Sequence, residues 1–320
     1  MRHEPQAGPS RTRRLTDPRL FCTFSIVGAD PPAGEVGVAV QSKYLAVGAV
    51  VPWAHAGVGA VATQAMGFAG FGPQILHALR SGESPTAALA SAIASDPLSA
   101  RRQLGVVDAS GRAANYTGAD CMAWAGGLTA DTYAVQGNIL AGEGVVREMA
   151  RAFEASSGLL AERLMASLEA GQAAGGDKRG EQSAALVVER QGYAAETGLG
   201  IDRVIDLRVD DHPHPIGELR RLLGLRLRQE VAFRAMRPYL EKDFARAASI
   251  MAEGAETYPD SPEILYDLSC FESLAGRTDD SLLHLRRALE LAPGMRAMAA
   301  ADADFDPLRT DPRLAVLLKV

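Results

Sequence analysis

The chain has 320 residues, 47% of them hydrophobic, so it is long enough for about two domains with packed cores. Its formal net charge of −6 argues against nucleic-acid or anionic-membrane partners, which are held mainly by clustered Lys and Arg. The three cysteines are odd in number and far apart, which favours a reducing compartment, so we expect a cytoplasmic protein without a disulfide framework. No apolar run reaches about 18 residues, the length a membrane-spanning helix needs.

Residues 1–22 are rich in Arg, Pro, Ser and Gly, and this composition predicts a disordered leader. Two arginines before the apolar stretch 20–29 faintly resemble an export signal. Asp17 and Pro18 interrupt that approach and no small-residue cleavage site follows, so we do not expect export.

Residues 23–65 are Val- and Gly-rich and nearly free of charge. Short apolar runs broken by Gly and Pro are typical of strands buried on both faces. The sequence therefore predicts a central sheet that contains the runs 23–28, 34–42, 44–53 and 57–65.

Helices and strands alternate in blocks after this sheet. Two helical patterns come first, and the second begins with Ser84 as cap and Pro85 as first helical residue. The expected elements after them are a hairpin at 102–118, a strand at 132–138, helices at 144–154 and 159–172, and strands at 183–190 and 203–211. This order predicts an α+β fold with helices against both outer faces of two packed sheets, four layers in all.

The composition changes after about residue 222 to Ala, Leu, Arg and Glu with helical spacing. Small residues and a proline recur after 34 residues: Ala247, Gly254 and Pro259 correspond to Ser281, Ala288 and Pro293. This period resembles the tetratricopeptide repeat, over two units followed by a capping helix in the tail. We expect a leader at 1–22, an αββα domain at 23–222 and a helical repeat domain at 223–320.

Thr23 opens the first predicted strand and is the candidate nucleophile. An N-terminal Thr can use its own α-amino group as the base, because that group has an ordinary pKa of about 7.7 to 8.0. The amine exists only after the Cys22–Thr23 bond is cut, so we expect autoprocessing. Cys22 is the second candidate, since a thiol is the stronger nucleophile and cleavage after Phe21 would expose it.

Six ordered segments resemble a known family: TFSIV, GEVGVAVQS, PWAHAGVGAVATQ, QGN, GGDKRGEQSAAL and IDLRVDDHPHPI. The chain resembles, over residues 23–222, the bacterial domain of unknown function 1028 family of the N-terminal-nucleophile (Ntn) hydrolase clan. The resemblance implies the αββα sandwich of that clan and, less strongly, an amide-bond hydrolase.

Comparison with the proteasome-like threonine hydrolases of the clan implies further site residues. Thr23 matches their nucleophile, and Ser42 and Lys43 match a conserved pair on the second strand, where Gln41 stands in place of an acid. Ser183 matches a serine near the nucleophile's amine, Gly180 takes the place of an aspartate, and Asp177 is the nearby substitute. The groups that would tune the amine or bind substrate are Gln41, Ser42, Lys43, Asp177, Arg179, Gln182 and Ser183.

Gln64 and Asn138 are the candidate oxyanion donors, because amides at strand ends would face the cleft. Ordinary structural roles compete with these assignments: Thr23 as a strand residue, Gln64 and Asn138 as buried amides, and 177–179 as a charged turn. His212 and His214 each precede a proline in an apparent linker, so we expect no metal and no cofactor.

The function predicted from the sequence is hydrolysis of a small-molecule or peptide amide by Thr23. The alternative is an inactive Ntn-fold scaffold whose residues 223–320 dock a protein partner. A homodimer is expected because twofold assemblies are the commonest oligomers.

Overall fold

The computed structural model describes residues 20–21 and 23–319. Of the leader predicted to be disordered, residues 1–19 and 22 lie outside these residues, and so does the alternative nucleophile Cys22. The prediction is wrong for Leu20–Phe21, which form a short strand that pairs with Ala65 and Met66. The chain divides into two compact units. The first contains the residues up to Glu189 together with Arg208–Ile216, and the second contains Arg190–Leu207 and the residues from Gly217 onwards.

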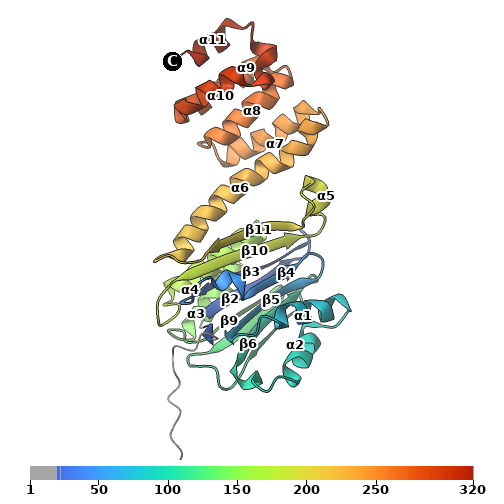
Figure 1. Cartoon of the computed structure of the whole chain (residues 1–320), viewed down its shortest axis with the longest axis vertical. Coiled ribbons are helices and arrows are strands. Elements are labelled where there is room, and N and C mark those ends of the chain that lie inside the picture. The colour runs from blue at the N-terminus through green and yellow to red at the C-terminus, as the bar shows by residue number, and fades with distance from the viewer. Residues whose placement is uncertain (1–19, 22, 320) are drawn as a thin grey trace, which may run out of the picture. The chain divides into compact units, whose positions relative to one another are not determined.

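Two antiparallel sheets form the centre of the first unit (Figure 1), although most of the last strand of one sheet, Arg203–Leu207 of β11, is assigned to the second unit. One sheet has the order β1-β5-β6-β7, and β4 also pairs with β5. Its strands are β1 (Leu20–Phe21), β4 (Pro52–His55), β5 (Gly59–Met66), β6 (Arg102–Asp108) and β7 (Ala113–Thr117). The other has the order β11-β10-β3-β2-β9-β8, with β2 (Thr23–Asp30), β3 (Glu35–Ser42), β8 (Gly126–Ala130), β9 (Tyr133–Gly137), β10 (Ser183–Arg190) and β11 (Arg203–Val209).

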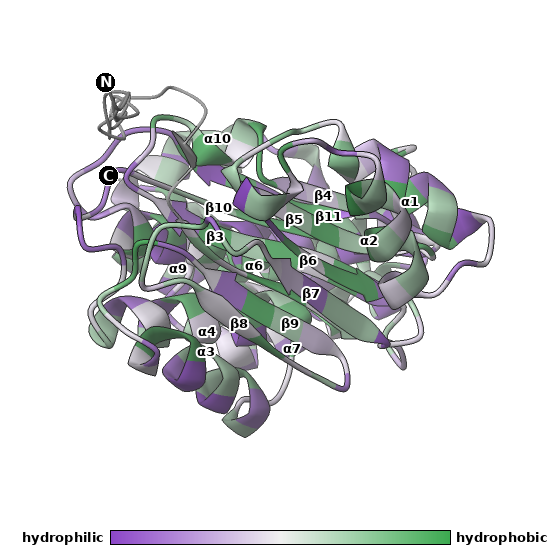
Figure 2. Cartoon of the chain, turned by 90° about the horizontal axis from the view of Figure 1, so that it is seen from below, coloured by the Kyte–Doolittle hydropathy of each residue, from purple (hydrophilic) through white to green (hydrophobic). Residues whose placement is uncertain are grey.

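The two sheets face each other across a core of small aliphatic side chains. Val27 and Val38 come from one sheet and Ala62 and Val107 from the other, and all four are fully buried in one cluster. Helices α1 (Phe71–Arg80) and α2 (Pro85–Ala94) pack outside the β5 sheet, and α3 (Gly144–Ala155) and α4 (Leu160–Ala173) pack outside the β2 sheet (Figure 2). Mixed α+β architecture with antiparallel sheets is therefore confirmed.

Local signals located several of these elements correctly. Ser84 caps α2 by accepting a hydrogen bond from the Ala87 amide, and Pro85 is its first helical residue. The strand predicted at 44–53 is wrong over most of its length: residues 47–49 form a short 3-10 helix and only Pro52–His55 pairs as a strand. Ala46 has φ 54°, which no strand adopts, and the Val47 amide donates to Ser183 Oγ (3.1 Å) instead of to a strand.

The second unit has a helical core. Its helices are α5 (Tyr193–Thr197), the part of α6 (Pro215–Leu240) from Gly217 onwards, α7 (Phe244–Thr257), α8 (Pro262–Leu274), α9 (Thr278–Leu291), α10 (Arg296–Ala301) and α11 (Pro312–Leu318). Buried residues of α7, α8 and α9, including Met251, Leu268 and Leu285, share one apolar cluster. The predicted C-terminal helical region is confirmed. Within residues 20–21 and 23–319, no helix combines the length and the apolar character that crossing a membrane requires.

Candidate functional site

Thr23 is the first residue of β2 and is completely buried. It lies directly opposite Ser42, the last residue of β3, and its Oγ1 donates a hydrogen bond to Ser42 Oγ (3.1 Å). Opposed residues of an antiparallel pair project to the same face, and Val27 and Val38 on these strands lie in the core between the sheets. The Thr23 hydroxyl therefore lies on the inner face of its sheet, with a polar neighbour.

The carbonyl oxygen of Thr23 is held from both sheets. It accepts hydrogen bonds from the backbone amide of Asn138 (3.0 Å) and from Gln64 Nε2 (3.3 Å). The structure thus places both predicted oxyanion donors beside Thr23, on its own carbonyl group. Their role as donors to a substrate oxyanion stays a prediction.

Gln64 and Asn138 belong to a larger set of buried polar side chains, which we call the amide cluster: Ser25, Gln64, Gln103, Gln136 and Asn138. Gln103 Oε1 accepts from Gln64 Nε2 (2.9 Å) and from Asn138 Nδ2 (2.9 Å). Ser25 Oγ donates to Gln64 Oε1 (2.7 Å) and accepts from Gln136 Nε2 (2.7 Å). One chain of hydrogen bonds therefore links the two sheets next to Thr23.

Ser25, Gln103 and Gln136 were not predicted as site residues. Ser25 pairs with Gln136 across β2 and β9, and Gln64 pairs with Gln103 across β5 and β6. A usable signal was present in the sequence: each is a polar residue in a strand whose central residues are mostly apolar, and buried polar groups need partners. The pairing registers that bring them together follow from contacts between distant segments and are not visible locally.

The amide cluster retains one unpaired acceptor. Gln136 Oε1 is buried without a hydrogen-bond partner. A Cβ atom at Gly105 would lie 2.2 Å from this oxygen, so glycine at position 105 provides the room for the Gln136 amide. A strand glycine that admits the close approach of another group is a recurrent feature.

Two residues with left-handed backbone follow the amides that hold Thr23. Ala65 comes directly after Gln64 and has φ 66°, and Ile139 comes directly after Asn138 and has φ 54°. This region is unusual for any residue with a side chain and most of all for a β-branched one. Such backbone conformations cost free energy and persist only where the surrounding structure enforces them. They are found most often at functional sites.

The segment 177–179 lies beside the end of β3. The Lys43 amide donates to Asp177 Oδ2 (3.3 Å), and Arg179 Nη2 donates to the same oxygen (2.7 Å). The Asp177 side chain is fully buried, so water does not solvate its carboxylate. The guanidinium of Arg179 balances the negative charge instead. Asp177 thus bonds to the residue that follows Ser42, and its charge is already paired with that of Arg179.

The remaining predicted tuning groups point elsewhere. Lys43 Nζ donates to the Glu181 carbonyl (2.9 Å), and Ser183 Oγ donates to the Tyr44 carbonyl while accepting from the Val47 amide. Gln182 Nε2 donates to Asp211 (3.1 Å), and only its backbone amide reaches the Ser42 carbonyl (3.1 Å).

Gln41 precedes Ser42 on β3, so its side chain projects to the opposite face of the sheet, the face that α4 covers. Both amide atoms of Gln41 are buried without a hydrogen-bond partner. Because side chains alternate between the two faces of the sheet along β3, the Gln41 side chain lies on the opposite face from the Thr23 hydroxyl.

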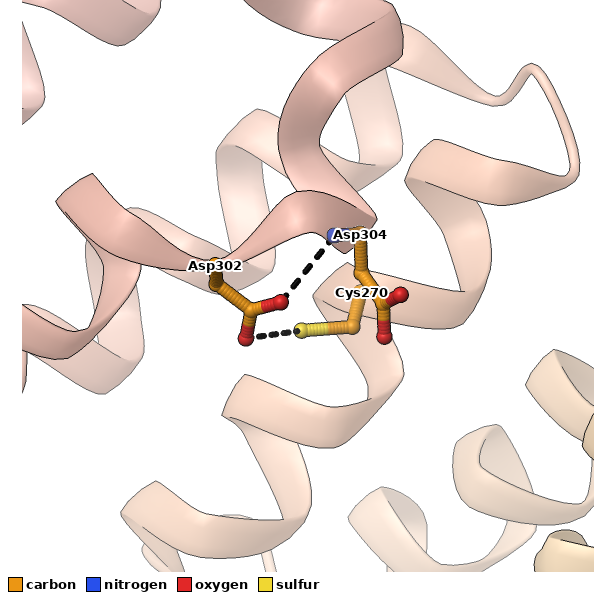
Figure 3. Close-up of side chains that lie close together, drawn as sticks. All are labelled: Cys270, Asp302 and Asp304. Carbon is orange, nitrogen blue, oxygen red and sulfur yellow. Dashed lines mark hydrogen bonds between the residues drawn. The ribbon is translucent and has the colours of Figure 1, made fainter.

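A second polar cluster lies in the helical unit. One ligand atom from each of Cys270, Asp302 and Asp304 falls within 4.8 Å of the others (Figure 3). Tyr266 Oη donates to Asp302 (2.8 Å) and Cys270 Sγ lies 3.8 Å from the same carboxylate oxygen. Burial, followed by the charges of Asp302 and Asp304, raises the pKa of the Cys270 thiol, which favours the neutral form over the thiolate that metals bind.

All the named partners of Thr23 are neutral hydroxyl and amide groups. They can fix the position of the residue, but they are poor proton acceptors near neutral pH. The base in any reaction at Thr23 would therefore be a group that this hydrogen-bond network does not supply, and the residue's own α-amine meets that requirement once the preceding bond is broken.

Comparison with known proteins identifies the family of the chain. The model of the "Family of unknown function (DUF1028)" matches residues 23–219, and the chain belongs to this family. The chain is also similar to the crystal structure of protein SPO2555 from Silicibacter pomeroyi, which is assigned to the same family. The two are 33% identical with a TM-score of 0.58, over 63% of this chain and 84% of that one. No curated protein matches the chain.

Proposed function

We propose that the first unit is an N-terminal-nucleophile amidohydrolase of the αββα class, with Thr23 as the nucleophile. The observation that carries the proposal is the position of Thr23. It heads a strand, its hydroxyl bonds to Ser42 Oγ at 3.1 Å, and its carbonyl is fixed by Asn138 and Gln64. A buried hydroxyl needs a partner in any role, so the proposal is carried by where Thr23 lies, at the start of its strand and directly after the bond that would be cut, with Ser42 and the amides of both sheets fixing it there.

The reaction begins with self-cleavage. Thr23 Oγ attacks the carbonyl carbon of residue 22, the C–N bond breaks, and the hydroxyl proton passes to the nitrogen, which becomes the free α-amine. Water then hydrolyses the ester, which leaves the leader with a carboxyl end. In each later turnover Oγ attacks a substrate amide, the α-amine carries the proton to the leaving amine, and water releases the acyl group as an acid.

Intact-mass analysis of the purified protein tests this proposal. We expect a chain that begins at Thr23, and we expect Thr23→Ala to remain at full length. Cys22→Ala is the matched control, because residue 22 supplies only the carbonyl that is attacked, and it should still be cleaved. Full-length mass for both the native chain and Cys22→Ala would contradict self-cleavage. Cleavage before residue 22 that Cys22→Ala abolishes would identify Cys22 as the nucleophile.

The helical unit is proposed to be a tetratricopeptide-like module that docks a protein partner or a second copy. Helices α7 and α9 begin at Phe244 and Thr278, one 34-residue period apart. Gly254 supports close helix packing, since a Cβ atom there would lie 2.4 Å from Val231. Light scattering of the full chain tests the expected homodimer, and a monomer at all concentrations would contradict it.

A further inference from the structure

The residues just before Thr23 occupy the edge of the opposite sheet. In β1, Leu20 pairs with Met66 and Phe21 pairs with Ala65, antiparallel to β5. On the same edge of β5, pairing with β4 runs from Gly59 to Ala62 and ends there. On its other edge β5 pairs with β6 as far as Ala65. β4 and β1 therefore pair with successive parts of one edge of β5, β4 with Gly59–Ala62 and β1 with Ala65 and Met66. We call the backbone of Ala65 and Met66 the β5 edge.

The chain changes sheets at the proposed cleavage point. β1 belongs to the β5 sheet, whereas β2, which starts at Thr23, belongs to the other sheet. Leu20 and Phe21, on the acyl side of the 22–23 bond, thus form an extended strand held by the β5 edge. Because this strand precedes the proposed scissile bond, the β5 edge marks where the acyl side of a reacting chain would bind.

A cavity of about 240 Å³ opens next to this edge. Its walls include Phe68, Phe71, Ala92, Asp96, Pro97 and Arg102. Arg102 connects the cavity with the edge, because its Nη1 donates to the Met66 carbonyl. Asp96 accepts from Arg102 Nε (2.6 Å), so the charge of the guanidinium is balanced. Phe68, Phe71, Ala92 and Pro97 form the apolar part of the wall, and Gln74 and Ser95 add polar groups to it.

We propose that the β5 edge is the acyl-side binding site of the Thr23 centre, and that the substrate is an extended peptide that pairs there as β1 does. This inference rests on the function proposed above and specifies its substrate class. Strand addition supplies affinity through main-chain hydrogen bonds, and an adjacent pocket supplies selectivity. The cavity that Arg102 links to Met66 favours a peptide with a side chain near the scissile bond that can pack against Phe68 and Phe71.

A binding experiment tests the edge independently of catalysis. The protein is a chain that begins at Thr23, and the probe is a synthetic peptide of residues 16–22 with Cys22→Ser. We expect NMR shift changes at the amides of Ala65 and Met66. A peptide N-methylated at Leu20 and Phe21 should bind about tenfold more weakly, because it loses main-chain donors. Equal binding of the two peptides, or shifts confined to other residues, would overturn the proposal.

Hydrogen exchange provides a second measurement, in which the full-length Thr23→Ala chain keeps its leader. An amide of the β5 edge should exchange at least about tenfold more slowly in this chain than in the chain that begins at Thr23. Identical exchange rates would refute the pairing.

Two substitutions test the cavity. Phe68→Ala should weaken peptide binding, whereas Leu45→Ala, at an exposed residue outside the cavity wall, should leave peptide binding unchanged. Peptide binding without any reaction at Thr23 would support the site and refute the hydrolase.

Discussion

Replacement of Gln103 by leucine tests the amide cluster, because this side chain makes five hydrogen bonds, to Gln64, Asn138, Thr117 and the carbonyl groups of Gly126 and Gly137. Gln103→Leu removes the acceptor of Asn138 Nδ2 (2.9 Å) and the donor to the Gly137 carbonyl (2.8 Å). Each buried group left unsatisfied costs about 1 to 3 kcal/mol, and the apolar side chain recovers part of this. We expect the free energy of unfolding to fall by about 3 kcal/mol.

Urea denaturation followed by tryptophan fluorescence measures this loss. Both tryptophans, Trp53 and Trp124, lie in the first unit, so the signal reports the unit that contains the cluster. Gln74→Leu on the exposed face of α1 is the matched control and should change stability by no more than about 0.5 kcal/mol. If Gln103→Leu were as stable as this control, the hydrogen bonds between the sheets would contribute nothing, and our account of how Thr23 is fixed would be refuted.

Three further outcomes are expected. Gly105→Ala should lower stability by about 1 to 3 kcal/mol in the same assay, because its methyl group would meet a buried amide, whereas Gly144→Ala, which meets nothing within 4 Å, should not. Burial, with a smaller contribution from nearby carboxylates, raises the pKa of Asp267 to about 6, so its ionisation destabilises the fold as pH rises from about 4 to 6. Asp267→Asn should therefore be more stable than the native chain by about 2 kcal/mol at pH 7.5 in thermal melts, and equal stability at pH 7.5 would contradict this. Ser42→Ala removes the hydroxyl partner of Thr23 and should slow self-cleavage about tenfold in a mass-spectrometric time course, and an unchanged rate would exclude a role for that hydrogen bond.

Local sequence signals predicted the elements of the fold well. The cap at Ser84 and the two helical patterns 144–154 and 159–172 depend on residues that are neighbours in the chain, and each appears within a residue or two of its expected bounds. The exceptions depend on distant contacts. Residues 44–51 are apolar like a strand, but Ser183, far along the chain, fixes their turn.

The candidate site was predictable in part. Thr23 was recognised from its position at the start of a strand and Ser42 from the resemblance to the threonine hydrolases, and the structure places them opposite each other. Gln41 was grouped with them because it takes the place of an acidic residue in the segment that resembles those hydrolases, although adjacent side chains of a strand project to opposite faces. Gln103 was missed because its importance comes from the β5–β6 register, which no local pattern fixes.

Acylation of Thr23 is the most direct test of the central claim, that this hydroxyl is the nucleophile of the protein. A chain beginning at Thr23 is treated with a β-lactone, whose ring opens on a reactive hydroxyl so that the full mass of the reagent is retained. Peptide mass spectrometry should locate one adduct on Thr23, and Thr23→Ala should take up none. An unmodified Thr23, or equal labelling of the Thr23→Ala chain, would contradict the account.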